Sequence, residues 1–219
     1  MRYLFKYVLY LIVTIGFSVS KAGSYDDFFR AITMDDVRTV ESLLRRGFDP
    51  NTLNPQAQHP LLLGLREPSP KVVQLLLAQP KLQVDVRNLQ DETPLMMAAL
   101  KGQLDVATRL IELKADVNKP GWTPLHYAAT AADVRIIRLL LDHDAYLDAE
   151  SPNGTTPLMM AAMYGSPAAV KVLLEAGADP SIQNNLGLSA LDFANQVNRQ
   201  DSAALIQAFL LGKMAPAAQ

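Results

Sequence analysis

Apolar residues along the chain fall into two short patterns that alternate. The first opens with Thr-Pro-Leu and runs into two alanines, as at residues 123–129. The second follows downstream as an apolar run with polar interruptions, typical of the buried face of a helix; it occurs at residues 72–77, 136–141 and 170–174. A threonine hydroxyl accepts an orphan backbone N–H at a helix start, and proline fits the first helical position. The pattern therefore predicts pairs of short helices joined by turns.

The Thr-Pro-Leu pattern recurs at a nearly constant spacing. Its proline position falls at Pro60, Pro94, Pro124, Pro157 and, in a weaker copy, Ala190, so the steps are 34, 30, 33 and 33 residues. A period near 33 indicates a solenoid, in which each unit packs only on its neighbours. We expect an all-α fold without an extended sheet.

Longer motifs agree with this spacing and resemble the ankyrin-repeat family. Residues 121–126 (Gly-Trp-Thr-Pro-Leu-His) and 154–158 match the opening of the family's repeat, and residues 173–179 and 115–118 match its close. The resemblance runs from about residue 25 to residue 212. It implies an all-α ankyrin-repeat solenoid of about six helix-turn-helix repeats with short finger loops.

The register of the motifs divides the chain into three parts. Residues 1–22 are an expected signal peptide, residues 24–213 the ankyrin-repeat array and residues 214–219 a short tail. The expected repeats are residues 24–54, 55–88, 89–118, 119–149, 150–184 and 185–212.

Several positions depart from the family pattern. Lys114 and Asp144 stand where second helices end in glycine, and Ala132 replaces a glycine after a first helix. A left-handed backbone there costs alanine or lysine roughly 1 kcal/mol or more. The finger after Pro80 is one residue longer than the pattern. The finger between Asn118 and Thr123 is three residues short, which predicts a tight, truncated turn.

The first 22 residues have the composition of a secretory signal peptide. Arg2 and Lys6 precede an apolar run from Tyr7 to Val19, and residues 20–22 (Ser-Lys-Ala) form a small-x-small cleavage site. The alternative is a membrane anchor, although spanning a bilayer takes about 20 apolar residues. The chain has no cysteine, which excludes lipid attachment at a lipobox. We expect a periplasmic or secreted protein with no stable membrane anchor after signal cleavage, and an exported member of this family points to a Gram-negative periplasm.

Charge narrows the range of partners. The whole chain has 20 basic and 22 acidic residues, and removing Arg2, Lys6 and Lys21 leaves 17 against 22, a net charge of −5. An acidic chain without a basic run argues against nucleic acid as a partner. We expect a protein partner, no nucleic acid and a monomer.

Catalytic and metal-binding chemistry find little support in the sequence. There is no His-Glu-x-x-His, Gly-x-Ser-x-Gly or phosphate-cradling glycine loop. Of the three histidines, His126 occupies the family's motif position, where the resemblance implies a hydrogen bond to backbone in the adjoining finger. His59 lies at a weak copy of the helix cap, and His143 at a helix end. We expect a non-enzymatic protein with no cofactor and no metal.

The resemblance implies a binding surface made of first helices and finger tips. Residues at these positions do not pack in the core of a solenoid, so they set which partner it binds. Transferred to this chain, the candidate partner-binding residues are Leu89, Gln90, Glu92, Leu100, Lys101, Trp122, Thr130, Ala131, Pro152, Asn153, Thr155, Met163 and Tyr164. Trp and Tyr are enriched at binding hot spots. Alternatively, Trp122 fills the gap left by the shortened finger.

The leading hypothesis is a non-catalytic protein-protein interaction module that binds through the concave face of its array in the periplasm. One alternative is an immunity or inhibitor protein that blocks an exported enzyme. Another is an enzyme whose site the sequence does not reveal.

Overall fold

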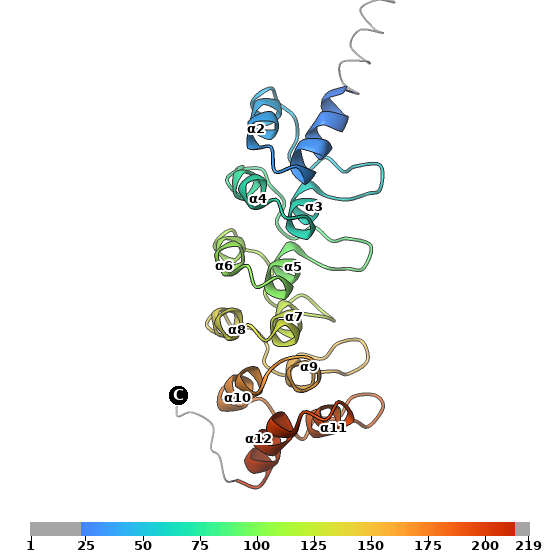
Figure 1. Cartoon of the computed structure of the whole chain (residues 1–219), viewed down its shortest axis with the longest axis vertical. Coiled ribbons are helices and arrows are strands. Elements are labelled where there is room, and N and C mark those ends of the chain that lie inside the picture. Colours follow the sequence, from blue (N-terminus) through green and yellow to red (C-terminus); the bar gives the residue numbers. More distant parts are fainter. Residues whose placement is uncertain (1–22, 213–219) are drawn as a thin grey trace, which may run out of the picture. The chain divides into compact units, whose positions relative to one another are not determined.

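The computed structural model describes residues 23–212, which form successive pairs of short helices (Figure 1). Within this range there is no β-strand, and the one isolated β-bridge joins Gln183 to Ser189. The predicted all-α fold is therefore confirmed. No helix among these residues has the length and apolar character needed to cross a membrane.

The chain divides into two compact units, Met1–Gln83 and Val84–Gln219. The described helices of the first unit are residues 23–33, α2 (Val37–Arg45), α3 (Pro60–Arg66) and α4 (Pro70–Leu77). Those of the second unit are α5 (Pro94–Leu100), α6 (Leu104–Glu112), α7 (Pro124–Ala131), α8 (Val134–Leu141), α9 (Pro157–Met163), α10 (Pro167–Glu175), α11 (Ala190–Gln196) and α12 (Gln200–Leu210).

The second unit is built from two rows of helices. Helices α5, α7, α9 and α11, here the first-helix row, pack on one another in sequence order, as do α6, α8, α10 and α12, the second-helix row. Leu95, Leu125 and Leu158, the leucines of the Thr-Pro-Leu copies, are fully buried between neighbouring helices. The repeating core explains the period, because each unit buries its apolar face against the next.

Each first helix of the second unit begins with a reciprocal cap. Thr93, Thr123, Thr156 and Ser189 each accept a backbone N–H from the third helical residue. That third residue accepts the N–H of the cap residue in return: His126 through Nδ1 at 3.1 Å, and Met96 and Met159 through Sδ at 3.3 and 3.4 Å. Both methionines are buried, so a thioether sulfur takes over the cap bond of the imidazole.

The predicted left-handed residues are confirmed. The φ angles of Lys114, Ala132 and Asp144 are +70°, +59° and +61°. Gly177, at the end of α10, has the same conformation with φ of +102°. Lysine and alanine therefore carry a strain that the glycine avoids.

The fingers, which are the loops before first helices, have one repeated geometry with one exception. In three fingers of the second unit, an N–H bonds the carbonyl four residues later at 3.0–3.1 Å: Asn88 to Glu92, Ser151 to Thr155 and Asn184 to Leu188. Residues 119–122, here the shortened finger, contain no such turn. In Figure 1 the loop before α7 reaches less far from the helices than the loops before α5 and α9.

Side-chain bonds locate the three missing residues. Asp85, Asn118 and Asp148 each accept, through a side-chain oxygen, a backbone N–H of the following repeat. From these residues to the next helix cap the chain takes 8, 5 and 8 residues, ending at Thr93, Thr123 and Thr156. The predicted truncation is confirmed, and it removes the finger tip.

The expected signal peptide (1–22) and tail (214–219) lie outside the described residues. The expected repeat boundaries stay predictions.

Candidate functional site

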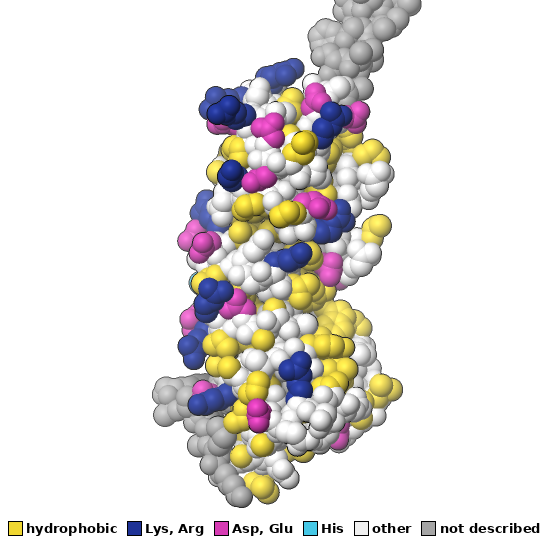
Figure 2. Space-filling view, viewed as in Figure 1, with side chains coloured by type: hydrophobic (Ala, Val, Ile, Leu, Met, Phe, Trp, Pro, Cys, Tyr) yellow, Lys and Arg dark blue, Asp and Glu magenta, His cyan; other side chains and the backbone are white. Residues whose placement is uncertain are grey.

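An apolar cleft of about 290 Å³ lies in the second unit beside the shortened finger. It is lined by Leu100, Trp122, His126, Tyr127, Thr130 and Met160. We call it the Trp122 cleft. Its walls come from three first helices, α5, α7 and α9, and from the residue before the Thr123 cap. On the face shown in Figure 2, hydrophobic side chains gather beside α7 and α9.

Three of the candidate partner-binding residues meet in this cleft: Leu100, Trp122 and Thr130. Tyr127 and Met160 line it as well and were missing from the prediction. Tyr127 lies three residues before Thr130 on α7, so the helical period could have revealed it. Met160 precedes an Ala-Ala pair near the end of α9 and is only partly buried.

Other candidates lie at finger tips or helix ends. Leu89 is 85 % exposed, and Gln90, Pro152, Asn153 and Lys101 are also exposed. Leu186, in the last finger, is 78 % exposed and was not predicted. Exposed leucines at two finger tips are available to a partner.

Tyr164 and Met163 lie at the end of α9, where Tyr164 is 52 % exposed and Met163 half-buried. The guanidinium of Arg199 donates to the carbonyls of Met163, Gly165 and Tyr164 at 2.9, 2.8 and 3.2 Å. Arg199 therefore satisfies the free carbonyls of this helix end and holds the backbone from which both side chains project.

One candidate does not reach the surface. Thr155 is buried, its N–H bonds the hydroxyl of Ser151, and its carbonyl oxygen lies 2.8 Å from His126 Nε2. The regular finger turn holds the residue before the Thr156 cap inward, so the Thr155 side chain is not accessible to a partner. Ala131, also a candidate, is half-buried at the end of α7.

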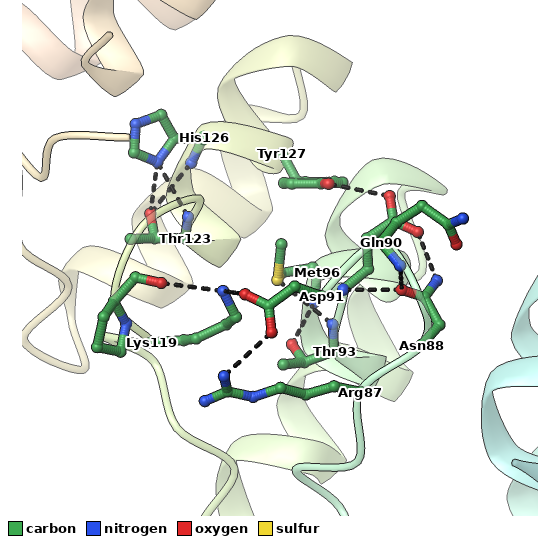
Figure 3. A network of polar contacts seen from close by, with 12 residues as sticks. Arg87, Asn88, Gln90, Asp91, Thr93, Met96, Lys119, Thr123, His126 and Tyr127 are labelled. Atoms are coloured by element: carbon green, nitrogen blue, oxygen red, sulfur yellow. Dashed lines mark hydrogen bonds and ion pairs between the residues drawn. The ribbon is translucent and has the colours of Figure 1, made fainter. Parts of the chain in front are cut away.

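The shortened finger is held by a buried lysine. The side chain of Lys119 is 2 % exposed, its Nζ donates to the carbonyl of Pro120 at 2.9 Å, and it forms an ion pair with Asp91 (Figure 3). Arg87 also donates to Asp91, at 3.0 Å. The hydrogen bond from Lys119 lowers the pKa of Asp91, and Arg87 adds to the effect. The charges fasten the shortened finger to the finger before it.

Glu92 lies next in the chain and has different partners. Its Oε1 accepts from the hydroxyl of Tyr127 at 2.9 Å, and its Oε2 accepts from Asn88 Nδ2 at 2.7 Å (Figure 3). Burial, and then the bonded carboxylate of Glu92, raise the pKa of Tyr127 well above its usual value. The Tyr127 hydroxyl therefore stays protonated and orients the carboxylate beside the cleft.

His126 has the structural role that the resemblance implied. Its Nδ1 accepts the N–H of Thr123, so Nε2 carries the proton and donates to the carbonyl of Thr155 at 2.8 Å. Burial lowers the pKa of His126 to about 4, which keeps the ring neutral at pH 7. Trp122 meets this ring edge-on, with centroids 5.2 Å apart. Trp122 therefore both packs against His126 and lines the cleft.

No group of three or more His, Asp or Glu side chains within residues 23–212 is arranged to hold a metal ion. The arrangement around the Trp122 cleft offers apolar contact, aromatic faces and one oriented carboxylate. It is suited to recognising a side chain.

The helix pairs, reciprocal caps and fingers define a repeat protein of helix-turn-helix units. A family model for ankyrin repeats (3 copies) matches residues 28–120, 113–184 and 146–211, and the chain belongs to the ankyrin-repeat family, a family of protein-interaction modules.

Curated relatives share the repeats over part of their length. The neurogenic locus notch homolog protein 1 of Xenopus tropicalis is 42 % identical over 120 residues, covering 52 % of this chain and 5 % of that protein. The nuclear factor NF-kappa-B p105 subunit of Gallus gallus is 34 % identical over 161 residues, covering 70 % of this chain and 16 % of that protein. The chain thus spans a small part of these relatives.

A solved structure matches over a larger share of both chains. It is the Bd0816 predatory endopeptidase from Bdellovibrio bacteriovorus in complex with immunity protein Bd3460. A chain of this complex superposes with a TM-score of 0.72 and 27 % sequence identity, covering 83 % of this chain and 96 % of that chain.

Proposed function

We propose that this chain is a non-catalytic binding protein that holds a protein partner on the first-helix row and finger tips of its second unit. The observation that carries the proposal is the Trp122 cleft, an apolar recess in the same unit as the exposed side chains of Leu89 and Tyr164. Exposed aromatic and aliphatic side chains around a recess are characteristic of binding hot spots. The proposed binding surface comprises Leu89, Leu100, Trp122, Tyr127, Met160, Met163 and Tyr164.

The partner is first isolated by affinity purification with the full chain from its source cells. Isothermal titration calorimetry then compares Tyr164→Ala and Met163→Ala with wild type. Truncating a hot-spot side chain costs about 2 kcal/mol or more of binding free energy. Arg135→Ala on α8 and Lys171→Ala on α10 are matched controls, since both side chains are exposed on the second-helix row. Wild-type affinity in the first pair with loss in the second would place the site on the second-helix row instead.

A more specific candidate is an immunity or inhibitor protein that blocks an exported hydrolase. It is supported by the likeness to a chain of an endopeptidase–immunity protein complex over 83 % of this chain. The basic and apolar pattern of residues 1–22, which favours a secreted or periplasmic location, supports it too. An inhibitor acts by occupying its target, so it needs no catalytic group of its own.

Enzyme kinetics distinguish this candidate from a scaffold. If the purified partner is a hydrolase, one equivalent of the chain is expected to abolish its activity, and Tyr164→Ala to restore it. Full activity of the saturated complex would exclude inhibition while leaving the binding function intact. The intact mass of the protein recovered from the periplasm tests export, with a start near Gly23 as the expected result.

A further inference from the structure

Glu92 has no cation partner among the described residues, although its neighbour Asp91 has two. Asp91 binds both Lys119 and Arg87, whereas Glu92 forms no ion pair and receives only the neutral donors of Tyr127 and Asn88. Its side chain is half-buried. A carboxylate withdrawn from water is normally neutralised by a nearby cation. The carboxylate of Glu92 can therefore accept a cation from a partner.

The hydrogen bonds leave the carboxylate available on both oxygens. Each oxygen of Glu92 accepts one bond in the structure, and a carboxylate oxygen has two lone pairs. Two parallel N–H groups of a guanidinium match such a pair of oxygens. The Tyr127 hydroxyl connects this carboxylate to the Trp122 cleft, since Tyr127 lines the cleft and lies 2.9 Å from Glu92 Oε1.

The walls of the cleft suit the rest of an arginine side chain. Leu100 and Met160 are aliphatic surfaces for a methylene stem, and Trp122 and Tyr127 offer aromatic faces to a planar cation. A volume of about 290 Å³ is below the usual range for drug-sized ligands, so it fits one long side chain.

The charge of the second unit favours the same chemistry. Residues 84–212 contain 15 Asp and Glu against 9 Lys and Arg, a net charge of −6. A field of this sign attracts basic partners and speeds their association.

We propose that the Trp122 cleft is the socket for one arginine side chain of the partner, with its stem along Leu100 and Met160 and its guanidinium on Glu92. This proposal rests on the proposed function and names the chemistry that the binding surface recognises. Specificity then resides in Glu92, because an apolar side chain entering the cleft would leave the charge unpaired.

Trp122 supplies the test, since it is the only tryptophan of the chain. Its fluorescence in the full chain is titrated with n-butylguanidinium, n-butylurea and n-butylammonium chloride. The guanidinium and the urea have nearly the same shape but differ in charge. We expect a dissociation constant of roughly millimolar order for n-butylguanidinium, as suits a probe of this size. We expect at least about tenfold weaker binding of n-butylurea, a difference that shrinks as salt screens the charge.

A matched pair of variants then assigns the effect. Glu92→Gln is expected to bring n-butylguanidinium to the affinity of n-butylurea, while Glu112→Gln, an exposed glutamate on α6, leaves the tenfold difference unchanged. The comparison of probes on the wild-type chain needs no variant, so it stands even if Glu92→Gln folds poorly.

Equal affinity for the guanidinium and the urea, tighter binding of the ammonium, or no fluorescence change with any probe overturns the arginine socket. None of these results affects the proposed function, which fails on a different measurement: a partner whose affinity is unchanged by Tyr164→Ala and Met163→Ala.

Discussion

The two units contain helix pairs of the same kind, but different residue types pack between the helices. In residues 23–83 the first helix packs through aromatic rings: Phe28 lies 4.3 Å from Phe48 and 5.4 Å from Phe29 between centroids. In residues 84–212 the buried residues are mainly leucine, alanine, isoleucine and methionine, and the one ring contact joins Trp122 to His126. The aromatic cluster gives a short segment a large buried area, whereas the second unit relies on repetition.

The units also differ in charge and in available surface. Residues 23–83 contain 7 acidic and 7 basic residues, but residues 84–212 contain 15 and 9. The Trp122 cleft and the shortened finger lie in the second unit. A repeat array that keeps its register can therefore contain a shortened finger and an excess of acidic residues without losing its core, since each repeat packs only on its neighbours.

The largest expected effect breaks the repeated core of the second unit. Leu125 is fully buried, so Leu125→Ala is expected to lower the free energy of unfolding by about 2–5 kcal/mol. Lys101→Ala, at an exposed helix end, is the control and is expected to be nearly neutral. Denaturant midpoints that rank the two in the opposite order would show that the register of the repeats is wrong.

A second effect compares one buried histidine from each unit. Burial lowers the pKa of both His59 and His126 to about 4 from the 6.5 expected when unfolded. Because the unfolded chain binds these protons first, stability is full above pH 6.5 and falls as the pH drops toward 4. The loss approaches roughly 3 kcal/mol for each histidine.

Thermal unfolding between pH 7 and pH 4.5 measures this slope. Replacing His59 and His126 together by glutamine is expected to flatten the profile over that interval, and each single variant to remove part of it. A profile with the wild-type slope in the double variant would assign the loss to the carboxylates.

Much of this architecture could be predicted from the sequence. The period near 33, the caps and the truncated finger are local features, since Thr123 begins a helix and Lys114 ends one through their own backbone geometry. The interpretation of His126 was correct because a motif position fixes its partner in the next finger.

The cleft could be predicted only in part. Leu100, Trp122 and Thr130 were candidates because the family leaves their positions variable, but Tyr127 and Met160 were missed. Whether these two side chains stay accessible depends on how α5, α7 and α9 pack around the cleft, which the sequence near each residue does not reveal. The burial of Lys119 against Asp91 likewise depends on a contact between two fingers, and neither residue taken alone predicts it from the sequence.

A smaller effect asks whether Lys119 supports the shortened finger by packing or by charge. Lys119→Ala removes a buried side chain and is expected to cost about 2 kcal/mol. Lys119→Met keeps the stem, and Asp91 remains exposed and bonded to Arg87, so the cost is expected to stay below about 1 kcal/mol. Urea midpoints of the two variants decide the matter, and equal losses would indicate that the ion pair dominates.

The smallest effect has opposite signs in the two units. Gly47 follows α2 with φ of +89°, and Lys114 follows α6 with φ of +70°. A residue with a side chain is strained in this conformation by roughly 1 kcal/mol. Glycine avoids the strain, but it raises the conformational entropy of the unfolded chain, which offsets part of the gain in stability. Lys114→Gly is therefore expected to stabilise the protein by up to about 1 kcal/mol, and Gly47→Ala to destabilise it by a similar amount. No atom lies within 4 Å of a Cβ added at Gly47, so the cost there comes from the backbone conformation and not from a clash. Differential scanning calorimetry of both variants tests the pair. A lower melting temperature for Lys114→Gly would mean that the lysine makes a compensating contact that outweighs its backbone strain.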